Sequence, residues 1–132
     1  MSRYGLLRAG MRSIQWMACD QNVWRASHEA LKYYRQDDSL YVSGQLKVLA
    51  VVRNFSPIKT VGIRYTTDNW ATWKDRDGVW CCHIDVENTD EFLLHTESTL
   101  SPGSLVSYAI YCVANGPTYW DNNDAVNYSA QF

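Results

Sequence analysis

The chain has 132 residues, of which 46% are hydrophobic and 20% are charged, and its formal net charge is −2. This length suits one domain with a single core, and the slightly acidic balance excludes the positive surface on which nucleic-acid binding depends. No apolar run approaches the roughly twenty residues that span a bilayer. Three arginines interrupt the start "MSRYGLLRAGMRSIQW", so we expect no signal peptide. The expected location is cytoplasmic, or secreted if the chain was cut from a longer precursor.

The first 39 residues are expected to form an N-terminal extension that packs on, or precedes, a domain at residues 40–132. Within this extension, "SHEALKYYRQ" offers Ser27 as an N-cap followed by good helix formers. Leu31 and Tyr34 are its only well-spaced apolar pair. A short helix and an edge strand therefore both remain open for this segment.

From residue 40 onward the sequence predicts short strands separated by turn signals. In "GQLKVLAVVRN" apolar and polar residues alternate, while Leu49 and Val51 interrupt the polar face, which favours a central strand with one partly covered side. Further strands are predicted in "TVGIRYTT", "VWCCHIDV", "EFLLHTE", "LVSYAIYCVA" and "PTYW", with the turn-rich "DNWATWKDRDG" after the first of these. Strands this short, at such spacings, are typical of an all-β sandwich.

The four cysteines, Cys19, Cys81, Cys82 and Cys112, are predicted to be buried reduced thiols, because no spacing matches a zinc knuckle. Adjacent Cys81 and Cys82 should point to opposite faces of a strand and so should not pair with each other. A disulfide from Cys19 to one of the others remains open. The run "DNND" at 121–124 lacks the glycine and distal glutamate of an EF-hand loop, so we predict no metal site and no cofactor.

Catalysis has little support in the sequence. His28, His83 and His95 are scattered and fall in no recognised nucleophile or metal motif. A glycosidase needs two carboxyl groups within about 5–10 Å, which a single sequence does not reveal. We therefore expect no enzyme, and a small glycosidase remains as the alternative class.

Aromatic content is the outlier: six Trp, nine Tyr and three Phe exceed what one core of this size needs, so some rings should face solvent or a ligand. A pyranose presents a C–H face that stacks on an indole and a rim of hydroxyls that an amide can both donate to and accept from. The segments "TYWDNNDAVNY" and "TTDNW" carry such groups. The alternative is that the rings close the core and the asparagines form turns. The candidate sugar-binding residues are Trp120, Asn122, Asn123, Asn127 and Tyr128 in the first segment and Asp68, Asn69 and Trp70 in the second.

Three ordered blocks resemble carbohydrate-binding module family 21, the starch- and glycogen-binding modules. They are "VRNFSPIKTVGIRYTTDNW", "YAIYCVANG" and "YWDNNDAVNY", and the resemblance covers residues 40–132. It implies an immunoglobulin-like antiparallel β-sandwich that binds starch, glycogen, maltooligosaccharides or cyclodextrin without catalysis. It also implies that Trp70 and Trp120 stack on the glucan and that Asn122 and Asn127 bind sugar hydroxyls.

Other positions depart from the family pattern. Lys59 occupies the lysine position associated with a second site, but Pro57 stands where many members carry an aromatic residue. The second site is therefore either lost or built from Phe55. Ala109 stands where some secreted members place a tyrosine contact.

Within the last block, Tyr119 and Tyr128 are expected to anchor the loop to the sandwich. Asp121 is expected to hold the shape of the loop by accepting hydrogen bonds from backbone N–H groups.

Members of this family are attached to secreted amylases and glucoamylases or lie within glycogen-targeting subunits of protein phosphatase type 1. The absence of a predicted signal peptide favours the second setting. "RSIQW" fits the loose phosphatase-docking pattern, with Ile14 and Trp16 as its two apolar anchors. The alternative for this stretch is a simple packed N-terminal strand. The expected protein partner is therefore a phosphatase catalytic subunit or a linked amylase.

Overall fold

The computed structural model describes residues 22–35 and 40–132. Among the described residues, no helix could span a membrane. The regular elements of this part of the chain are strands: β1 (Val23–Tyr34), β2 (Tyr41–Arg53), β3 (Thr60–Thr66), β4 (Lys74–Asp77), β5 (Val79–Ile84), β6 (Thr89–His95), β7 (Leu105–Val113), β8 (Thr118–Asp121) and β9 (Tyr128–Gln131).

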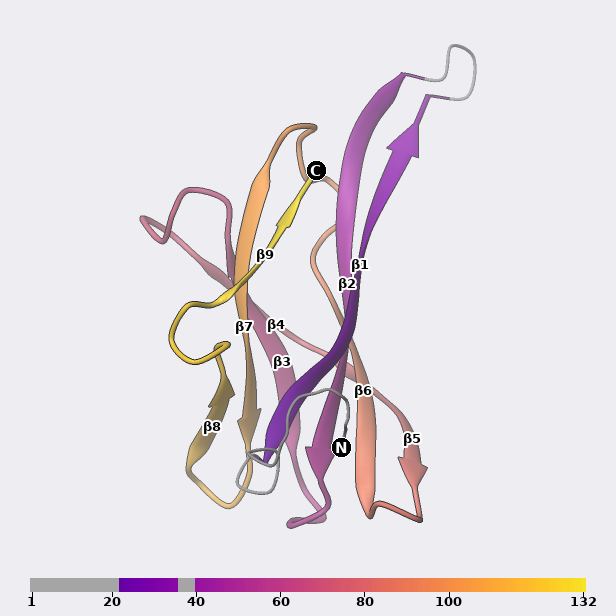
Figure 1. The fold of residues 1–132 in the computed structure, drawn as a ribbon, viewed down its shortest axis with the longest axis vertical. Helices are drawn as coiled ribbons and strands as arrows, with labels where there is room; N and C mark the ends of the chain where they lie inside the picture. The colour runs from indigo at the N-terminus through magenta and orange to yellow at the C-terminus, as the bar shows by residue number, and fades with distance from the viewer. Residues whose placement is uncertain (1–21, 36–39) are drawn as a thin grey trace.

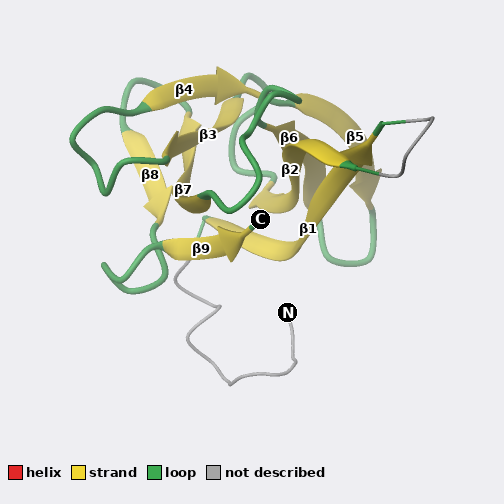
Figure 2. Ribbon diagram, turned by 90° about the horizontal axis from the view of Figure 1, so that it is seen from above, coloured by secondary structure: helices red, strands yellow, loops and turns green. Residues whose placement is uncertain are grey.

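The strands form two antiparallel sheets that pack face to face, as Figures 1 and 2 show from two directions. The first sheet has the order β1-β2-β6-β5. The second has the order β4-β3-β7-β8, and β9 also pairs with β7. The predicted all-β sandwich is therefore confirmed. The predicted central strand is confirmed too, because β2 lies between β1 and β6.

The core lies between the sheets and follows the period-two alternation of the central strands. Burying each large aliphatic side chain contributes about 1.5–3 kcal/mol relative to leaving it exposed. The buried cluster includes Leu46, Val48, Ala50 and Val52 of β2, Val61, Ile63 and Tyr65 of β3, Phe92 and Leu94 of β6, and Val106, Tyr108, Ile110 and Cys112 of β7. The opposite side chains of β3 and β7 consequently point away from the core, on the outer face of the second sheet.

The segment that contains Ser27 is a strand and not a helix. β1 pairs with β2 in antiparallel register from Val23 opposite Val52 to Tyr34 opposite Tyr41, and the two strands run side by side in Figure 1. The helix interpretation is wrong because this pairing satisfies the backbone of a long central strand, an arrangement that local helix propensity does not report. The edge-strand alternative is confirmed, and the described part of the sandwich starts with β1.

β4 lies inside the segment predicted to be turn-rich. Its sequence, Lys-Asp-Arg-Asp, is exposed throughout and has no apolar alternation. Antiparallel pairing with β3, from Gly62 opposite Asp77 to Tyr65 opposite Lys74, makes it a strand. Tertiary pairing therefore determines this element.

The cysteines differ partly from the prediction. Cys81, Cys82 and Cys112 are free thiols, as predicted, but only Cys112 is fully buried and Cys81 is exposed. Cys81 and Cys82 do not point to opposite faces, because a register shift interrupts β5 between Trp80 and Cys82. Cys19 lies outside the described residues.

Candidate functional site

The outer edge of the second sheet is interrupted, and the interruption creates a cavity. β8 and β9 pair with β7 one after the other, so that Ile110 lies opposite Asp121 and Tyr108 opposite Tyr128. Ala109, between these two positions, therefore faces the gap where the loop 122–127 leaves the sheet. Because its side chain is a single methyl group, space remains above it.

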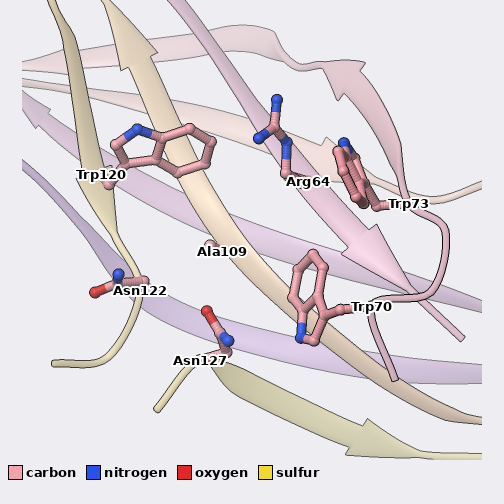
Figure 3. Close-up of a pocket in the computed structure, with 7 residues that line it drawn as sticks. All are labelled: Arg64, Trp70, Trp73, Ala109, Trp120, Asn122 and Asn127. Atoms are coloured by element: carbon pink, nitrogen blue, oxygen red, sulfur yellow. The ribbon is translucent and has the colours of Figure 1, made fainter. Parts of the chain in front are cut away.

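This space is a cavity of about 360 Å³ at the lower end of the range typical of ligand sites. We call it the indole cavity. Figure 3 shows its side chains arranged around Ala109, with the three indole rings set at different angles and the two amides on the loop side. Its lining residues are Arg64, Trp70, Trp73, Ala109, Trp120, Asn122 and Asn127.

Trp120 reaches the cavity from the outward face of β8 and is 40% exposed. Its ring meets the edge of Tyr111 at a centroid distance of 5.9 Å, and the Tyr111 hydroxyl donates a hydrogen bond to Asp77 Oδ1 at 2.6 Å. A Cβ at Gly62 would collide with that hydroxyl, so glycine is required where the tyrosine crosses β3. The indole is thus held by a tyrosine that is itself fixed at its far end.

Arg64 lies between two of the indoles. Its guanidinium carbon is 5.0 Å from the Trp120 ring centroid and 5.6 Å from that of Trp73, both within cation–π range. Asp75 accepts hydrogen bonds from Arg64 Nε at 2.8 Å and from Nη2 at 2.9 Å, and this pairing raises the pKa of Arg64. The guanidinium therefore spaces the two rings apart.

The predictions from sequence do not include Arg64 or Trp73. Trp73 follows Trp70 by three residues in "TTDNWATW", which is the only local signal for it. Arg64 alternates with the buried Ile63 and Tyr65 along β3 and so lies on the outer face, but nothing in the chain pattern indicates that β4 and Trp120 approach that face.

Trp70 is positioned by a compact loop between β3 and β4. The Thr66 hydroxyl accepts a hydrogen bond from the Trp70 backbone N–H at 3.1 Å, and Asp68 accepts from the Thr72 N–H at 2.9 Å. Hydrogen bonds from the Thr72 hydroxyl and backbone and from Thr66 hold the pKa of Asp68 at about 2. Asn69 and Trp70 both adopt left-handed backbone, with φ of 58° and 69°. Asp68 and Asn69 shape the loop and do not line the indole cavity.

The two amides come from the loop between β8 and β9. Asn122 Oδ1 accepts a hydrogen bond from the Ala125 N–H at 3.0 Å, and the Asn127 N–H donates to the Asn122 carbonyl at 2.7 Å. Asn127 has a φ of 65°, a conformation that asparagine tolerates better than most residues. Among the described residues its side-chain amide has no hydrogen-bond partner, so both its donor and its acceptor remain available for a ligand.

Asp121 holds the base of this loop, as predicted. The residue is 3% exposed. Its carboxylate accepts hydrogen bonds from the backbone N–H of Arg25 at 2.8 Å and of Asn123 at 3.2 Å, and from the Tyr128 hydroxyl at 2.7 Å. Burial raises the pKa of Asp121, against the opposing effect of these hydrogen bonds. Tyr119 and Tyr128 pack against the core, which confirms that they anchor the loop.

Lys59 does not reach the indole cavity. Its ammonium is 3.0 Å from Asp90 Oδ2, and it also donates hydrogen bonds to Asn54 Oδ1 and to the Ser56 carbonyl. These contacts use all three N–H donors, and the side chain is 5% exposed. Lys59 therefore braces the sandwich in this structure, and its assignment to a second sugar site stays a prediction. Phe55 packs against the edge of Tyr119 at a centroid distance of 5.1 Å.

A smaller cavity of about 200 Å³ shares Trp73 with the indole cavity, and we call it the side cavity. Tyr65 and Glu97 also line it. Within the described ranges, the Tyr65 hydroxyl and Glu97 Oε1 are buried oxygens without a hydrogen-bond partner. Its remaining lining residues are Thr66, Thr67, Thr72, Lys74, Thr99, Leu100, Ser101 and Ser104.

Indole rings and neutral amides line a shallow cavity on the outer face of a β-sandwich, and none of the three histidines lines it. This arrangement is typical of the class of sugar-binding modules. Comparison with known families is more specific. The family model described as "Carbohydrate/starch-binding module (family 21)" matches residues 21–131, and the chain belongs to this family. The resemblance noted in the sequence is therefore confirmed.

The chain is similar to several regulatory subunits of protein phosphatase 1. It is 32% identical over 90 residues to regulatory subunit 3C of Rattus norvegicus, and the matched segment covers 66% of this chain and 27% of that protein. It is 28% identical over 114 residues to regulatory subunit 3B of Homo sapiens, and the matched segment covers 82% of this chain and 37% of that protein. The chain thus spans between about a quarter and two fifths of the length of these relatives.

Two solved structures share the fold. The carbohydrate-binding module of the muscle glycogen-targeting subunit of protein phosphatase 1 matches with a TM-score of 0.59 and 27% identity, covering 83% of this chain and 74% of that chain. The starch-binding domain of Rhizopus oryzae glucoamylase, solved with β-cyclodextrin and maltoheptaose, matches with a TM-score of 0.61 and 21% identity, covering 94% and 100%. The second likeness concerns the fold alone.

Ile14 and Trp16 lie outside the described residues.

Proposed function

We propose that the chain binds starch or glycogen through the indole cavity and so brings an attached or bound enzyme to the polysaccharide. One observation carries the proposal: Trp70, Trp73, Trp120 and two asparagines, drawn from separate segments, line one cavity. Four of these five residues are among those that the sequence assigns to glucan contact. The family to which the chain belongs supports the same ligand class.

The chemistry of the cavity suits an uncharged oligosaccharide. Each pyranose that stacks on an indole contributes about 1–3 kcal/mol, by analogy with bases that stack on aromatic side chains. The free amide of Asn127 can donate to one sugar hydroxyl and accept from another. Rings set at different angles suit the curved path of an α-1,4-linked chain better than a flat one. Single sites of this kind are weak, and repeated engagement along a polymer raises the effective affinity.

The side cavity extends this proposal to longer chains. Trp73 belongs to both cavities, so a glucan that leaves the indole cavity on that side passes directly over the side cavity. There the exposed hydroxyls of Thr67, Thr72, Thr99 and Ser101 are available to sugar hydroxyls, directly or through bridging water. We therefore expect affinity to increase with chain length beyond what the indole cavity alone accommodates.

Calorimetric titration with maltotriose, maltoheptaose, β-cyclodextrin and cellohexaose tests the proposal. We expect saturable binding of the three α-glucans, tighter binding of maltoheptaose than of maltotriose, and no binding of the β-linked cellohexaose. Equal affinity for maltoheptaose and cellohexaose would overturn the assignment of an α-glucan. Incubation with amylose and assay of reducing ends separates binding from hydrolysis, and sustained release of sugar would support the glycosidase alternative.

The relatives favour one particular enzyme as the partner. We propose that the chain acts in the cytoplasm as part of a glycogen-targeting subunit and recruits a protein phosphatase 1 catalytic subunit. The phosphatase 1 regulatory subunits among its relatives and the sequence "RSIQW" support this assignment. A linked amylase is the alternative partner.

Two separable variants test this partner. Alanine at both Ile14 and Trp16 should abolish capture of the phosphatase catalytic subunit and leave retention on glycogen unchanged. Trp120→Ala should reduce retention on glycogen and leave capture of the phosphatase catalytic subunit unchanged. Phosphatase capture that is indifferent to Ile14 and Trp16 would refute docking through this motif, and a tagged protein confined to a secretory compartment would refute the cytoplasmic assignment.

A further inference from the structure

The outer edge of the first sheet carries sulfur and carboxylate donors that glucan binding does not use. The thiols of Cys81 and Cys82 and a carboxylate oxygen of Glu91 lie within 4.8 Å of one another. None of these residues lines the indole cavity or the side cavity. The cluster lies on β5 and β6, whereas both tryptophans assigned to stacking by sequence belong to the second sheet or its loops.

A β-bulge brings the two thiols together. Trp80 lies opposite Phe92 and Cys82 opposite Glu91, so Cys81 is an additional residue in β5 without its own partner in β6. In a regular strand, neighbouring side chains alternate between faces, but a bulge sets two residues against one and re-aims their side chains. Both thiols consequently face Glu91, and Cys82 Sγ donates a hydrogen bond to Glu91 Oε1 at 3.6 Å.

The cluster is accessible from solvent. Phe92 points into the core, so the preceding residue, Glu91, points to the outer face of the first sheet. Cys81 is exposed, while Cys82 and Glu91 are half-buried. Burial, together with the neighbouring Cys81 and Glu91, raises the pKa of the Cys82 thiol to about 11.

The donor set matches one class of metal ion. Two sulfur ligands at 2.3 Å and one oxygen at about 2.1 Å from a tetrahedral ion are about 3.6–3.8 Å from one another. Cys82 Sγ and Glu91 Oε1, at 3.6 Å, already lie in this range, and all three donor atoms lie within 4.8 Å of one another. Two thiolates favour zinc-type ions over magnesium or calcium, which prefer oxygen ligands alone.

We propose that Cys81, Cys82 and Glu91 bind one zinc-type divalent cation, with the fourth coordination position open to water. Binding displaces the thiol protons to solvent as the two sulfurs become thiolate ligands. His83 does not belong to the cluster: its Nδ1 lies 2.9 Å from Asp90 Oδ1 and its Nε2 lies 3.4 Å from Asp85 Oδ1. The cation joins β5, the edge strand, to β6 across the bulge.

Cobalt(II) titration tests the site by its spectrum. The experiment uses the full chain with the substitution Cys19→Ser, so that this thiol, which lies outside the described residues, contributes nothing. We expect one equivalent of Co²⁺ to produce thiolate-to-cobalt charge-transfer absorption, and one equivalent of Zn²⁺ to abolish it. Cys81→Ser and Cys82→Ser should each reduce that absorption, and replacing both should remove it.

A matched pair of carboxylate variants tests the third ligand. Glu91→Gln should weaken Co²⁺ binding at least about tenfold, the effect typical of losing a group that supports a metal site. Glu87→Gln removes an exposed carboxylate from the nearby β5–β6 turn and should leave the affinity unchanged. Equal effects of the two variants would show that only general negative charge attracts the cation, which overturns the site.

Two further results would overturn the proposal: no saturable absorption in the Cys19→Ser protein, or absorption that persists when both Cys81 and Cys82 are serine.

Because these variants could lose stability, the thermal midpoint of the Cys19→Ser protein is also measured with zinc and with a chelator. Zinc should raise the midpoint, because a ligand that binds the native state stabilises it by RT ln(1 + [L]/Kd). An unchanged midpoint at saturating zinc counts against the site. Maltoheptaose titration of the same samples should be unaffected by every cysteine substitution.

Discussion

Replacing Trp120 by alanine removes one exposed indole of the proposed glucan platform while leaving the sandwich core intact. In the free protein the indole contributes a cation–π contact with Arg64 at 5.0 Å and an edge contact with Tyr111 at 5.9 Å. These contacts are worth about 0.5–1 kcal/mol and 0.5–1.5 kcal/mol respectively. Unfolding free energy should therefore fall by no more than about 2–3 kcal/mol, and the domain should stay folded.

Trp120→Ala should weaken glucan affinity by more than the loss of an exposed indole elsewhere on the protein would. Stacking of about 1–3 kcal/mol corresponds to a roughly 5- to 150-fold weakening, since 1.4 kcal/mol is tenfold in an equilibrium constant. Calorimetry with β-cyclodextrin measures this directly, and circular dichroism confirms the fold. Trp80→Ala is the matched control, because Trp80 is also an exposed indole, at 56%, but lies on β5 of the other sheet.

The reasoning fails if Trp120→Ala binds β-cyclodextrin as tightly as the unmodified protein. It also fails if Trp80→Ala weakens binding to the same extent, because the affinity would then depend on aromatic surface in general and not on the indole cavity.

Three further predictions concern the side chains that shape the cavity. Arg64→Met should weaken maltoheptaose binding by about 2- to 5-fold, equivalent to a cation–π contact of about 0.5–1 kcal/mol, and unchanged calorimetric affinity would contradict its role. Asp121→Asn presents an N–H₂ group to donors, so the unfolding free energy measured in urea should fall by about 1–3 kcal/mol, and a neutral effect would mean that the hydrogen bonds are replaceable. Asp68 has a pKa of about 2, below its ordinary value, so its contribution to stability is complete above pH 4 and is lost as the pH falls toward 2. The thermal midpoint should consequently fall more steeply between pH 4 and pH 2 in the unmodified protein than in Asp68→Asn, whereas parallel curves would refute this assignment.

The indoles and amides predicted from the sequence do line one cavity. They could be predicted because their residue types and local spacing suggest sugar binding without knowledge of the fold. Trp120, Asn122 and Asn127 lie in one short stretch of sequence, and Trp70 lies in a turn rich in hydrogen-bonding residues. The sequence does not show which other strands place side chains next to the outward face of a given strand. Arg64 becomes a lining residue because β4 supplies Asp75 on one side and β8 supplies Trp120 on the other.

Register irregularities were the other feature that residue patterns did not reveal. Strict alternation separates Cys81 from Cys82, and a single extra residue in β5 reverses that conclusion. Lys59 shows a related difficulty. The family resemblance gives Lys59 a position but not its contacts, and in the folded chain Asp90, Asn54 and Ser56 occupy its ammonium.

The account makes one central claim: glucan binds in the indole cavity of the second sheet. The most direct measurement is a heteronuclear NMR titration that follows the indole N–H resonances of the assigned tryptophans as maltoheptaose is added. We predict saturable shifts for Trp70, Trp73 and Trp120, with Trp24 and Trp80 of the first sheet unaffected. Shifts confined to Trp24 and Trp80, or no saturable shift in any of the three cavity indoles, would contradict the account.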